Sequence, residues 1–343
     1  KTLFFEYPTL DELSGYFHEQ HNAVLADMLH PPTTDRADAT AVAQPLESQR
    51  ERPAAFASRA SGVSMAANGR SADDPIVVVG LAGRYPQAET LEAFWENLSL
   101  GRDCIEEIPD ERPDVAAQFR LRRGEPVRAH AYANWGGFLR DVDRFDAMFF
   151  NISPKEAEDL DPNERLLLEI AAHAIEDAGY TPATLAIGRG YRENPVGVYV
   201  GVMWGDYQLH GVDRARDAWV TPHAGYWAVA NRISYQFNFS GPSMAVDTAC
   251  SSSLTAIHLA CQALRQGEID VAIAGAVNLS LHANKYNLLA DMHMLAKDGR
   301  CRAFGADGTG YVPGEGVGAV VLKPLSSARR DGDHIYGILR GTS

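Results

Sequence analysis

The chain has 343 residues, of which 45 are acidic and 31 are basic, so its formal net charge is −14. This acidic balance disfavours nonspecific nucleic-acid binding, which depends on cations that match phosphates. Hydrophobic residues make up 45% and charged residues 22% of the sequence, ordinary globular values that exclude wholesale disorder. No apolar run approaches the roughly 18 residues that a membrane helix needs, and the first residues lack a signal-peptide pattern. We therefore expect a soluble, cytoplasmic protein that binds neither nucleic acid nor membrane.

Composition divides the chain into three zones. In residues 1–20, the capping-box spacing of Thr9 and Glu12 and an aromatic face predict a short helix. This helix cannot bury its face alone, so it is either the end of an upstream domain or a docking helix. Residues 21–73 are rich in alanine and contain one aromatic residue, Phe56. They predict a linker, with an irregular arm packed on the next domain as the alternative.

From residue 74 onward, buried strands alternate with amphipathic helices. A β-branched strand begins after Asp74 and is expected to break at Gly80, and a helix follows over 91–98. The next helix has Asp161 as its N-cap and Gly179 as its stop. Further strands are predicted over 195–203, 244–247 and 270–281, a helix over 251–266, and two strands over 316–325 and 334–341 joined by a turn at 331–333. Strands that are apolar on both faces indicate a layered α/β domain.

The sharpest chemical feature is Cys250, which lies where the strand over 244–247 runs into the next helix. Free N–H groups at a helix N-terminus stabilise a thiolate, and such a turn exposes the sulfur as in nucleophile elbows. The small neighbours Ala249 and Ser251 leave room for a substrate, and the N–H of Cys250 could help to bind an oxyanion. The alternative is a buried cysteine that packs as a small hydrophobe. The sequence context favours a nucleophile.

The other cysteines and the histidines give weaker signals. Cys104, Cys261 and Cys301 form no CxxC pair and no zinc-ligand spacing with the remaining residues, so we expect neither a disulfide framework nor a metal site. Cys261 is expected to pack in the core. His258 lies eight residues after Cys250, about 12 Å along a helix, which is too far for direct contact. Spacing therefore identifies no histidine partner for Cys250.

Two glycine-rich segments and one basic patch remain. The segment at 80–83 lacks the spacing of a dinucleotide-binding loop, and the segment at 308–318 lacks the lysine of a phosphate loop. We expect the glycines at 308–318 to let the backbone pass close to the helix after Cys250 and to a neighbouring strand. The patch from Arg120 to Arg128 is either a solvated loop or a docking surface for an acidic partner.

Several segments together resemble one enzyme family. Residues 246–268, VDTACSSSLTAIHLACQALRQGE, resemble the active-site segment of β-ketoacyl synthase, or ketosynthase, domains of modular polyketide synthases. PIVVVGLAGRYP, DPNERLLLEIAAHAIEDAGY and DGRCRAFGADGTGYVPGEGVGAVVLKPLSSA resemble that domain's opening strand, a helix and a glycine-rich hairpin, in the family's order. LSLHANKY and DGDHIYG are similar to the trans-acyltransferase class. TLFFEYPTLDELSGYF resembles the last helix of an acyl carrier domain.

This resemblance implies a thiolase-like fold, a homodimer and acyltransferase activity. Cys250 would take the growing acyl chain from the 4′-phosphopantetheine arm of an acyl carrier protein, with no cofactor bound directly and possible supply by a trans-acting acyltransferase. Segments 203–207 and 223–227 would line the acyl pocket. The domain order would be a carrier helix over 1–20, a linker over 21–73 and the N-terminal half of a ketosynthase over 74–343. The family's two catalytic histidines lie in motifs beyond 334–341, so we expect no condensation without the remaining half.

Three other functions stay open at this point. The domain could transfer or gate acyl chains without elongating them, because the histidine motifs that decide this are outside the sequence. It could instead be a half-domain that serves dimerisation and docking without catalysis. A cysteine hydrolase is less favoured, since no histidine or amide pattern accompanies Cys250.

Overall fold

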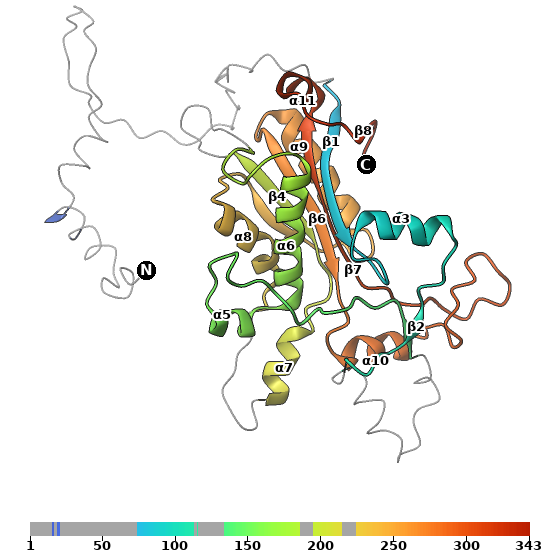
Figure 1. The fold of residues 1–343 in the computed structure, drawn as a ribbon. Coiled ribbons are helices and arrows are strands. Elements are labelled where there is room, and N and C mark those ends of the chain that lie inside the picture. Colours follow the sequence, from blue (N-terminus) through green and yellow to red (C-terminus); the bar gives the residue numbers. More distant parts are fainter. Residues whose placement is uncertain are drawn as a thin grey trace, which may run out of the picture. The chain divides into compact units, whose positions relative to one another are not determined.

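The computed structural model describes residues 74–112, 115, 134–185, 195–214 and 224–343, together with residues 16, 19 and 20. The strands, shown in Figure 1, are β1 (Ile76–Arg84), β2 (Glu106–Glu107), β3 (Trp135–Gly136), β4 (Val196–Gly201), β5 (Ser243–Val246), β6 (Val271–Asn278), β7 (Gly316–Pro324) and β8 (Gly337–Leu339). The helices are α3 (Leu91–Ser99), α5 (Pro154–Asp159), α6 (Pro162–Asp177), α7 (Tyr207–Arg214), α8 (Tyr226–Phe237), α9 (Ser252–Gln266), α10 (Ala283–Asp291) and α11 (Leu325–Asp331).

Three predictions fall on parts of the chain that the structure does not describe. Apart from residues 16, 19 and 20, the carrier-type helix over 1–20 lies outside the described residues, as does the whole linker over 21–73. The basic patch from Arg120 to Arg128 lies outside them too. All three therefore stay predictions.

Six strands form one mixed sheet in the order β5-β4-β6-β7-β1-β8. β4 runs parallel to β5 and to β6, whereas β7 is antiparallel to both β6 and β1, and β8 is antiparallel to β1. Parallel neighbours need a crossover connection, and α8 and α9 lie in the two connections that lead from β4 to β5 and from β5 to β6. This topology brings the carboxyl ends of β4, β5 and β6 to one edge of the sheet.

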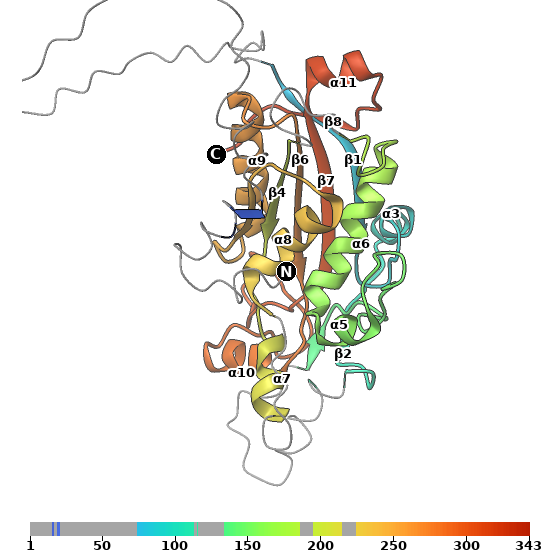
Figure 2. The same cartoon turned by 90° about the vertical axis from the view of Figure 1, so that its left-hand side faces the viewer.

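Helices cover both faces of the sheet. α6 and α8 pack against one face and α9 against the other (Figure 2). The α6 side has a core that includes Leu166 and Ile233, and the α9 side has one that includes Ala256 and Cys261, each of these four residues with 0% exposure. Every residue of β4 is buried, as expected for a strand covered on both faces. The predicted layered α/β architecture is confirmed.

The first strand is longer than predicted. We expected it to break at Gly80, but β1 continues to Arg84 past a bulge between Val78 and Gly80. A Cβ atom at Gly80 would lie only 2.4 Å from the carbonyl oxygen of Ala174 on α6. The glycine therefore allows a helix to approach the strand closely, and it does not end the strand.

The last two strands do not form the predicted hairpin. α11 follows β7 directly, and β8 pairs with β1, so that β1 lies between β7 and β8. The buried Lys323 of β7 supports this return, because its Nζ lies 2.8 Å from Asp331 Oδ2 and 2.5 Å from Asp333 Oδ2. The glycine at 332 has a φ of +76° and ends α11 instead of turning a hairpin.

Helix boundaries agree with the cap chemistry of the sequence. Asp161 caps α6 by accepting the Asn163 N–H at 2.8 Å, and Gly179 follows the helix with a φ of +80°. α9 ends at Gly267, which has a φ of +69°. Gly275 on β6 allows a close approach to β7, since a Cβ atom there would lie 2.8 Å from the carbonyl oxygen of Gly318. Among the described residues, no helix combines the length and apolarity needed to cross a membrane.

Candidate active site

Cys250 lies at the sharp turn between β5 and α9. Its predecessor Ala249 has a φ of +54°, in the left-handed region that non-glycine residues rarely adopt. Asp247 holds this conformation, because its Oδ1 accepts the Ala249 N–H at 3.0 Å. The result is a strained elbow that leaves the Cys250 thiol exposed.

Hydroxyl groups of the following residues brace the elbow. Ser252 Oγ accepts the Thr248 N–H at 2.9 Å and donates to the Ala249 carbonyl oxygen at 2.6 Å. Ser251 Oγ donates to the Thr248 carbonyl oxygen at 2.8 Å. These bonds bind the two sides of the turn to each other, so the position of the Cys250 backbone is fixed.

The first turn of α9 lies very close to the end of β4. A Cβ atom at Gly201, the last residue of β4, would lie 2.6 Å from the backbone nitrogen of Ser253. Only a glycine allows this approach. Cys250 precedes α9 by two residues, so it lies beside the N-terminus of that helix.

A cavity of about 850 Å³ contains Cys250 in its wall. Residues from β1, α3, β4, α9, β6, α10, β7 and the adjoining loops complete the wall, and most of them are apolar. They include Leu81, Ile257, Val277, Leu288, Leu289, Met203, Met292 and Met294. A concave apolar site can hold the hydrocarbon part of a small molecule.

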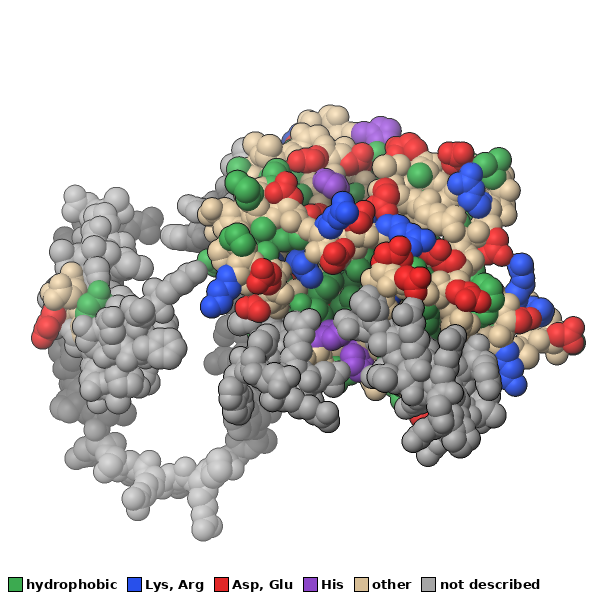
Figure 3. Space-filling view, turned by 60° about the horizontal axis from the view of Figure 1, so that its bottom comes forward, with side chains coloured by type: hydrophobic (Ala, Val, Ile, Leu, Met, Phe, Trp, Pro, Cys, Tyr) green, Lys and Arg blue, Asp and Glu red, His purple; other side chains and the backbone are tan. Residues whose placement is uncertain are grey.

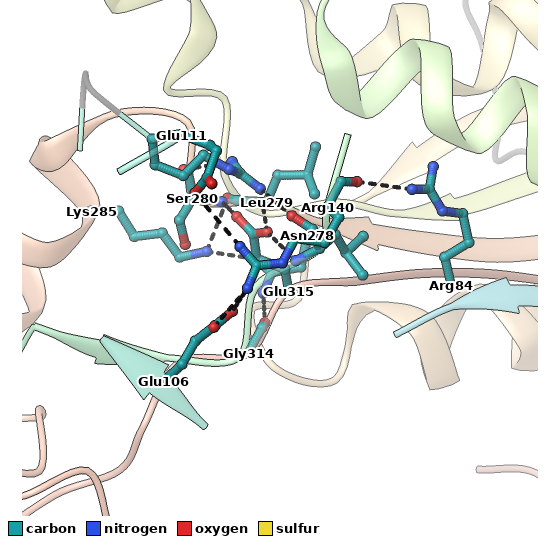
Figure 4. Close-up of polar contacts among 12 residues, drawn as sticks. Arg84, Glu106, Glu111, Arg140, Asn278, Leu279, Ser280, Lys285, Gly314 and Glu315 are labelled. Atoms are coloured by element: carbon teal, nitrogen blue, oxygen red, sulfur yellow. Dashed lines mark hydrogen bonds and ion pairs between the residues drawn. The ribbon is translucent and has the colours of Figure 1, made fainter. Parts of the chain in front are cut away.

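A buried charged network, drawn in Figure 4, adjoins the cavity, because its members Asn278, Lys285 and Gly314 also line the cavity wall. Glu315 Oε2 accepts bonds from Arg112 Nη2 at 2.6 Å and from the Leu139 N–H at 2.8 Å, and its Oε1 accepts the Ser280 N–H at 2.7 Å. Burial raises the pKa of Glu315, and Arg112 opposes that rise. Because the carboxylate meets a cation and two backbone donors, it acts as a structural bridge and offers no base to the cavity.

Lys285 of α10 is the cation in the cavity wall, and it is 2% exposed. Its Nζ donates to Asn278 Oδ1 at 2.9 Å and to the Leu279 carbonyl oxygen at 3.0 Å, as Figure 4 shows. The same Nζ lies 5.3 Å from the centre of the Trp204 ring. Burial lowers the pKa of Lys285 to about 8. This lysine anchors the start of α10 to the end of β6.

Tyr311 is a further polar group near the thiol. It is partly buried and lines the cavity together with Cys250. Burial, and after it the negative charge of Cys250 as a thiolate, raise the pKa of Tyr311. The phenol is therefore a neutral hydrogen-bond donor at neutral pH.

The sequence-predicted residues are only partly brought together. Met203 and Trp204 of the expected pocket segment 203–207 line the cavity of Cys250. Trp227, from the second expected segment, lines a different cavity of about 480 Å³ beside α8, and His223 lies outside the described residues. Tyr226 connects the two segments, because its hydroxyl donates to the Met203 carbonyl oxygen at 3.0 Å.

Cys261 packs in the core as predicted, and His258 makes hydrogen bonds away from Cys250. Cys261 is 0% exposed in the core under α9. The ring nitrogens of His258 make hydrogen bonds with Thr342 at 3.0 Å and Gln262 at 2.8 Å. In the part of the chain that the structure describes, no group of three or more His, Cys, Asp or Glu side chains could hold a metal ion.

The sequence analysis did not predict that α10 forms part of the cavity wall. The signal was available in part: His282 caps α10 by accepting the Asn284 N–H at 3.0 Å, a contact that marks a helix start. The local sequence around Lys285 does not predict its role. Its partner Asn278 belongs to the preceding strand, and the cavity exists only in the folded chain.

Charge is mixed on the described part of one face of the molecule (Figure 3). The face at the bottom of Figure 1 carries acidic and basic side chains interspersed around hydrophobic ones, which gather near its middle (Figure 3). The net acidity of the chain is therefore not concentrated into a single-sign patch on the described part of this face.

Comparison with known proteins decides the family. Residues 73–328 match the family model of the β-ketoacyl synthase N-terminal domain. The chain belongs to the ketosynthase family. This ketosynthase chain is 47% identical over its whole length to polyketide synthase ThaG of Burkholderia thailandensis and 45% identical to polyketide synthase PksL of Bacillus subtilis. It spans 6% and 8% of the length of these relatives.

Solved ketosynthase structures have the same fold. The oxazolomycin ketosynthase domain OzmH KS7 of Streptomyces albus is 50% identical, with a TM-score of 0.69 over 78% of this chain. The ketosynthase from module 6 of the bacillaene synthase of Bacillus subtilis is 41% identical, with a TM-score of 0.66. The chain spans 45% and 43% of these two structures. The predicted thiolase-like fold and ketosynthase family are confirmed, for the N-terminal half of such a domain.

Proposed function

We propose that this chain is the acyl-accepting half of an elongating ketosynthase in a polyketide synthase of the trans-acyltransferase class. The observation that carries the proposal is the exposed Cys250 on a braced elbow, at the N-terminus of α9 and in the wall of an apolar cavity. The match to polyketide synthases supports the substrate class.

The proposed first step is a transfer between two thioesters. The Cys250 thiolate attacks the carbonyl carbon of an acyl group carried on the phosphopantetheine arm of an acyl carrier protein. A new bond forms between the Cys250 sulfur and this carbon, and the negative charge moves to the carbonyl oxygen, near the N-terminal N–H groups of the helix. The bond to the pantetheine sulfur then breaks, and that sulfur leaves as a thiolate that takes a proton from water.

Decarboxylation and carbon–carbon bond formation would follow in the complete domain. His258 is the histidine nearest to Cys250 along the chain, and its ring nitrogens bond to Thr342 and Gln262. We propose that the remaining half of the ketosynthase supplies the groups for this step. In this proposal, residues 74–343 belong to the ketosynthase, and the segment before them comprises a carrier helix over 1–20 and a linker over 21–73.

The test is the acyl adduct itself. The full-length protein is incubated with an acyl thioester of N-acetylcysteamine and digested with trypsin. Cys250 and Cys261 lie on the same peptide, residues 233–265, because no Lys or Arg separates them. Fragment ions must therefore locate the adduct. We expect it on Cys250, and we expect Cys250→Ala to abolish it while the buried Cys261→Ala retains it.

Further outcomes separate the alternatives. No adduct in the folded protein would favour a dimerisation and docking scaffold over an enzyme. An adduct without β-ketoacyl product, after malonyl thioester is added, would favour a ketosynthase that transfers acyl chains without elongating them. Residues 1–343 expressed alone are expected to give the adduct and no condensation product.

A further inference from the structure

Methionines are concentrated around the candidate nucleophile. The chain has seven methionines, and three of them, Met203, Met292 and Met294, line the cavity of Cys250. Met203 follows β4, and the other two follow α10, so the three side chains reach one cavity from two separate parts of the fold. Within the described residues, Met292 is 58% exposed and Met294 is 36% exposed.

The backbone that carries these methionines is held in place. The Tyr226 hydroxyl donates to the Met203 carbonyl oxygen at 3.0 Å. The Met294 carbonyl oxygen accepts the Tyr311 N–H at 2.8 Å, and the Met294 N–H donates to the Leu289 carbonyl oxygen at 2.9 Å. These bonds hold the backbone of Met203 and Met294 in the described conformation, and the side chains keep their own rotational freedom.

The helix behind two of the methionines is anchored as well. Lys285 is bonded to Asn278 and to the Leu279 carbonyl oxygen, as Figure 4 shows, and the neighbouring Tyr286 is 1% exposed. The polar groups at this end of the cavity thus bind one another. The other residues that line the cavity from α10 and the segment after it are apolar, from Leu288 to Met294.

Methionine has a particular physical character in such a wall. Its unbranched side chain rotates about three bonds and carries a polarizable sulfur, so it fills spaces of different shape at low cost. Binding surfaces that accept several partners use methionine for this reason. β-branched residues, in contrast, have one strongly preferred side-chain conformation.

We infer that Met203, Met292 and Met294 form an adaptable wall that lets Cys250 accept apolar acyl chains with or without a branch next to the thioester. This inference rests on the proposed function and names its substrate class. The three methionines are specificity-determining residues, and the tolerance for branching resides in their side-chain freedom.

The experiment compares two thioesters in the full-length protein. Hexanoyl and 2-methylhexanoyl thioesters of N-acetylcysteamine are supplied separately, and the rate of adduct formation on Cys250 is measured by mass spectrometry of peptide 233–265. We expect the wild-type rates to agree within about threefold, and Met294→Ile to change their ratio by about tenfold, the discrimination that one methylene commands in a fixed apolar pocket. Met294→Leu, which keeps an unbranched Cβ, should lie between the two.

The control is Met148→Ile, because Met148 is 88% exposed and lines neither described cavity. It should leave the ratio unchanged. An unchanged ratio in both Met292→Ile and Met294→Ile, with the adduct still formed, would overturn this inference and leave the proposed function intact. A wild-type protein that already separates the two thioesters more than about tenfold would overturn it too. No adduct from either thioester would overturn the proposed function, and the inference with it.

Discussion

At the scale of single residues, the elbow shows how local strain is maintained. Ala249 sits in the left-handed region at a cost of about 1 kcal/mol or more, and short polar side chains on both sides hold it there. Asp247 and Ser252 each bond to the backbone of Ala249, so the strain is supported within six residues of sequence. The backbone conformation next to Cys250 is therefore supported by residues close to it in the chain.

Replacing Lys285 by Met should change how the free energy of unfolding varies with pH. Burial lowers the pKa of Lys285 from 10.5 to about 8. Between these values the unfolded chain binds more protons than the folded chain, so this residue makes the free energy of unfolding rise with pH, by about 3 kcal/mol in all. Below pH 8, Lys285 is protonated in both the folded and the unfolded chain, so its contribution to the free energy of unfolding is constant. Lys285→Met should lack the rise, as measured by urea denaturation from pH 7.5 to 10.5.

The control for this measurement is Lys155→Met on the exposed side of α5. Its stability should stay parallel to that of the wild type over the whole pH range. Parallel curves for Lys285→Met and the wild type would contradict the assignment of a lowered lysine pKa.

At the scale of elements, the site depends on how closely α9 approaches the sheet. Gly201 ends β4 under the first turn of α9, and Gly80 lets α6 approach β1 on the opposite face. Both helices are thereby brought against the central strands. A helix held this close has little freedom to shift, which keeps its N-terminal N–H groups beside Cys250.

Gly201→Ala should therefore disturb both stability and chemistry. The added Cβ would lie 2.6 Å from the Ser253 nitrogen, so the first turn of α9 must move away from β4. We expect a loss of about 1–3 kcal/mol in the free energy of unfolding, as for other overpacked cores, and slower acylation of Cys250. Urea denaturation and the adduct rate measure the two effects.

Gly337→Ala on β8 is the matched control, because a Cβ there meets nothing within 4 Å. It should leave both quantities close to wild type. If Gly201→Ala behaved like this control, the close approach of β4 and α9 would not be what positions Cys250.

At the scale of the whole molecule, one sheet edge carries the features of an interface. β5 has β4 as its only strand neighbour in the described sheet, and Met244 on β5 is 38% exposed. α8 packs beside β5 and exposes Trp227 and Tyr235, each at 66%. An unpaired strand edge next to exposed aromatic residues is a ready template for a second chain. We propose that two copies associate here, which agrees with the predicted homodimer.

A two-fold interface brings the same strand of each copy together, so Met244→Cys should cross-link to its own copy. In the full-length protein we expect a bismaleimide with a spacer of about 10 Å to join the two introduced thiols, since paired strands lie about 5 Å apart. Peptide mapping identifies the product. Met148→Cys should give no such product, although Met148 is the more accessible residue, at 88% exposure against 38% for Met244. Equal cross-linking of both variants would show random collision instead of a specific interface.

The sequence by itself determined the features that arise from neighbouring residues. Asp161, Pro162 and Gly179 set the bounds of α6, and Gly267 set the end of α9, because capping and left-handed turns act over a few residues. The same local logic placed Cys250 between a strand and a helix. The family motifs then identified the fold, since their order along the chain is itself a local property of the sequence.

Only the tertiary structure decided the features that join distant segments. β8 pairs with β1 instead of β7, its neighbour along the chain. Gly80 lies within β1 and does not end it, and a glycine is needed at this position because α6 lies against the strand. Arg112 and Glu315 are 203 residues apart and meet at 2.6 Å. The cavity of Cys250 takes its wall from seven helices and strands, so no window of sequence contains it. Such contacts depend on packing and burial, which the chain acquires only when its segments fold together.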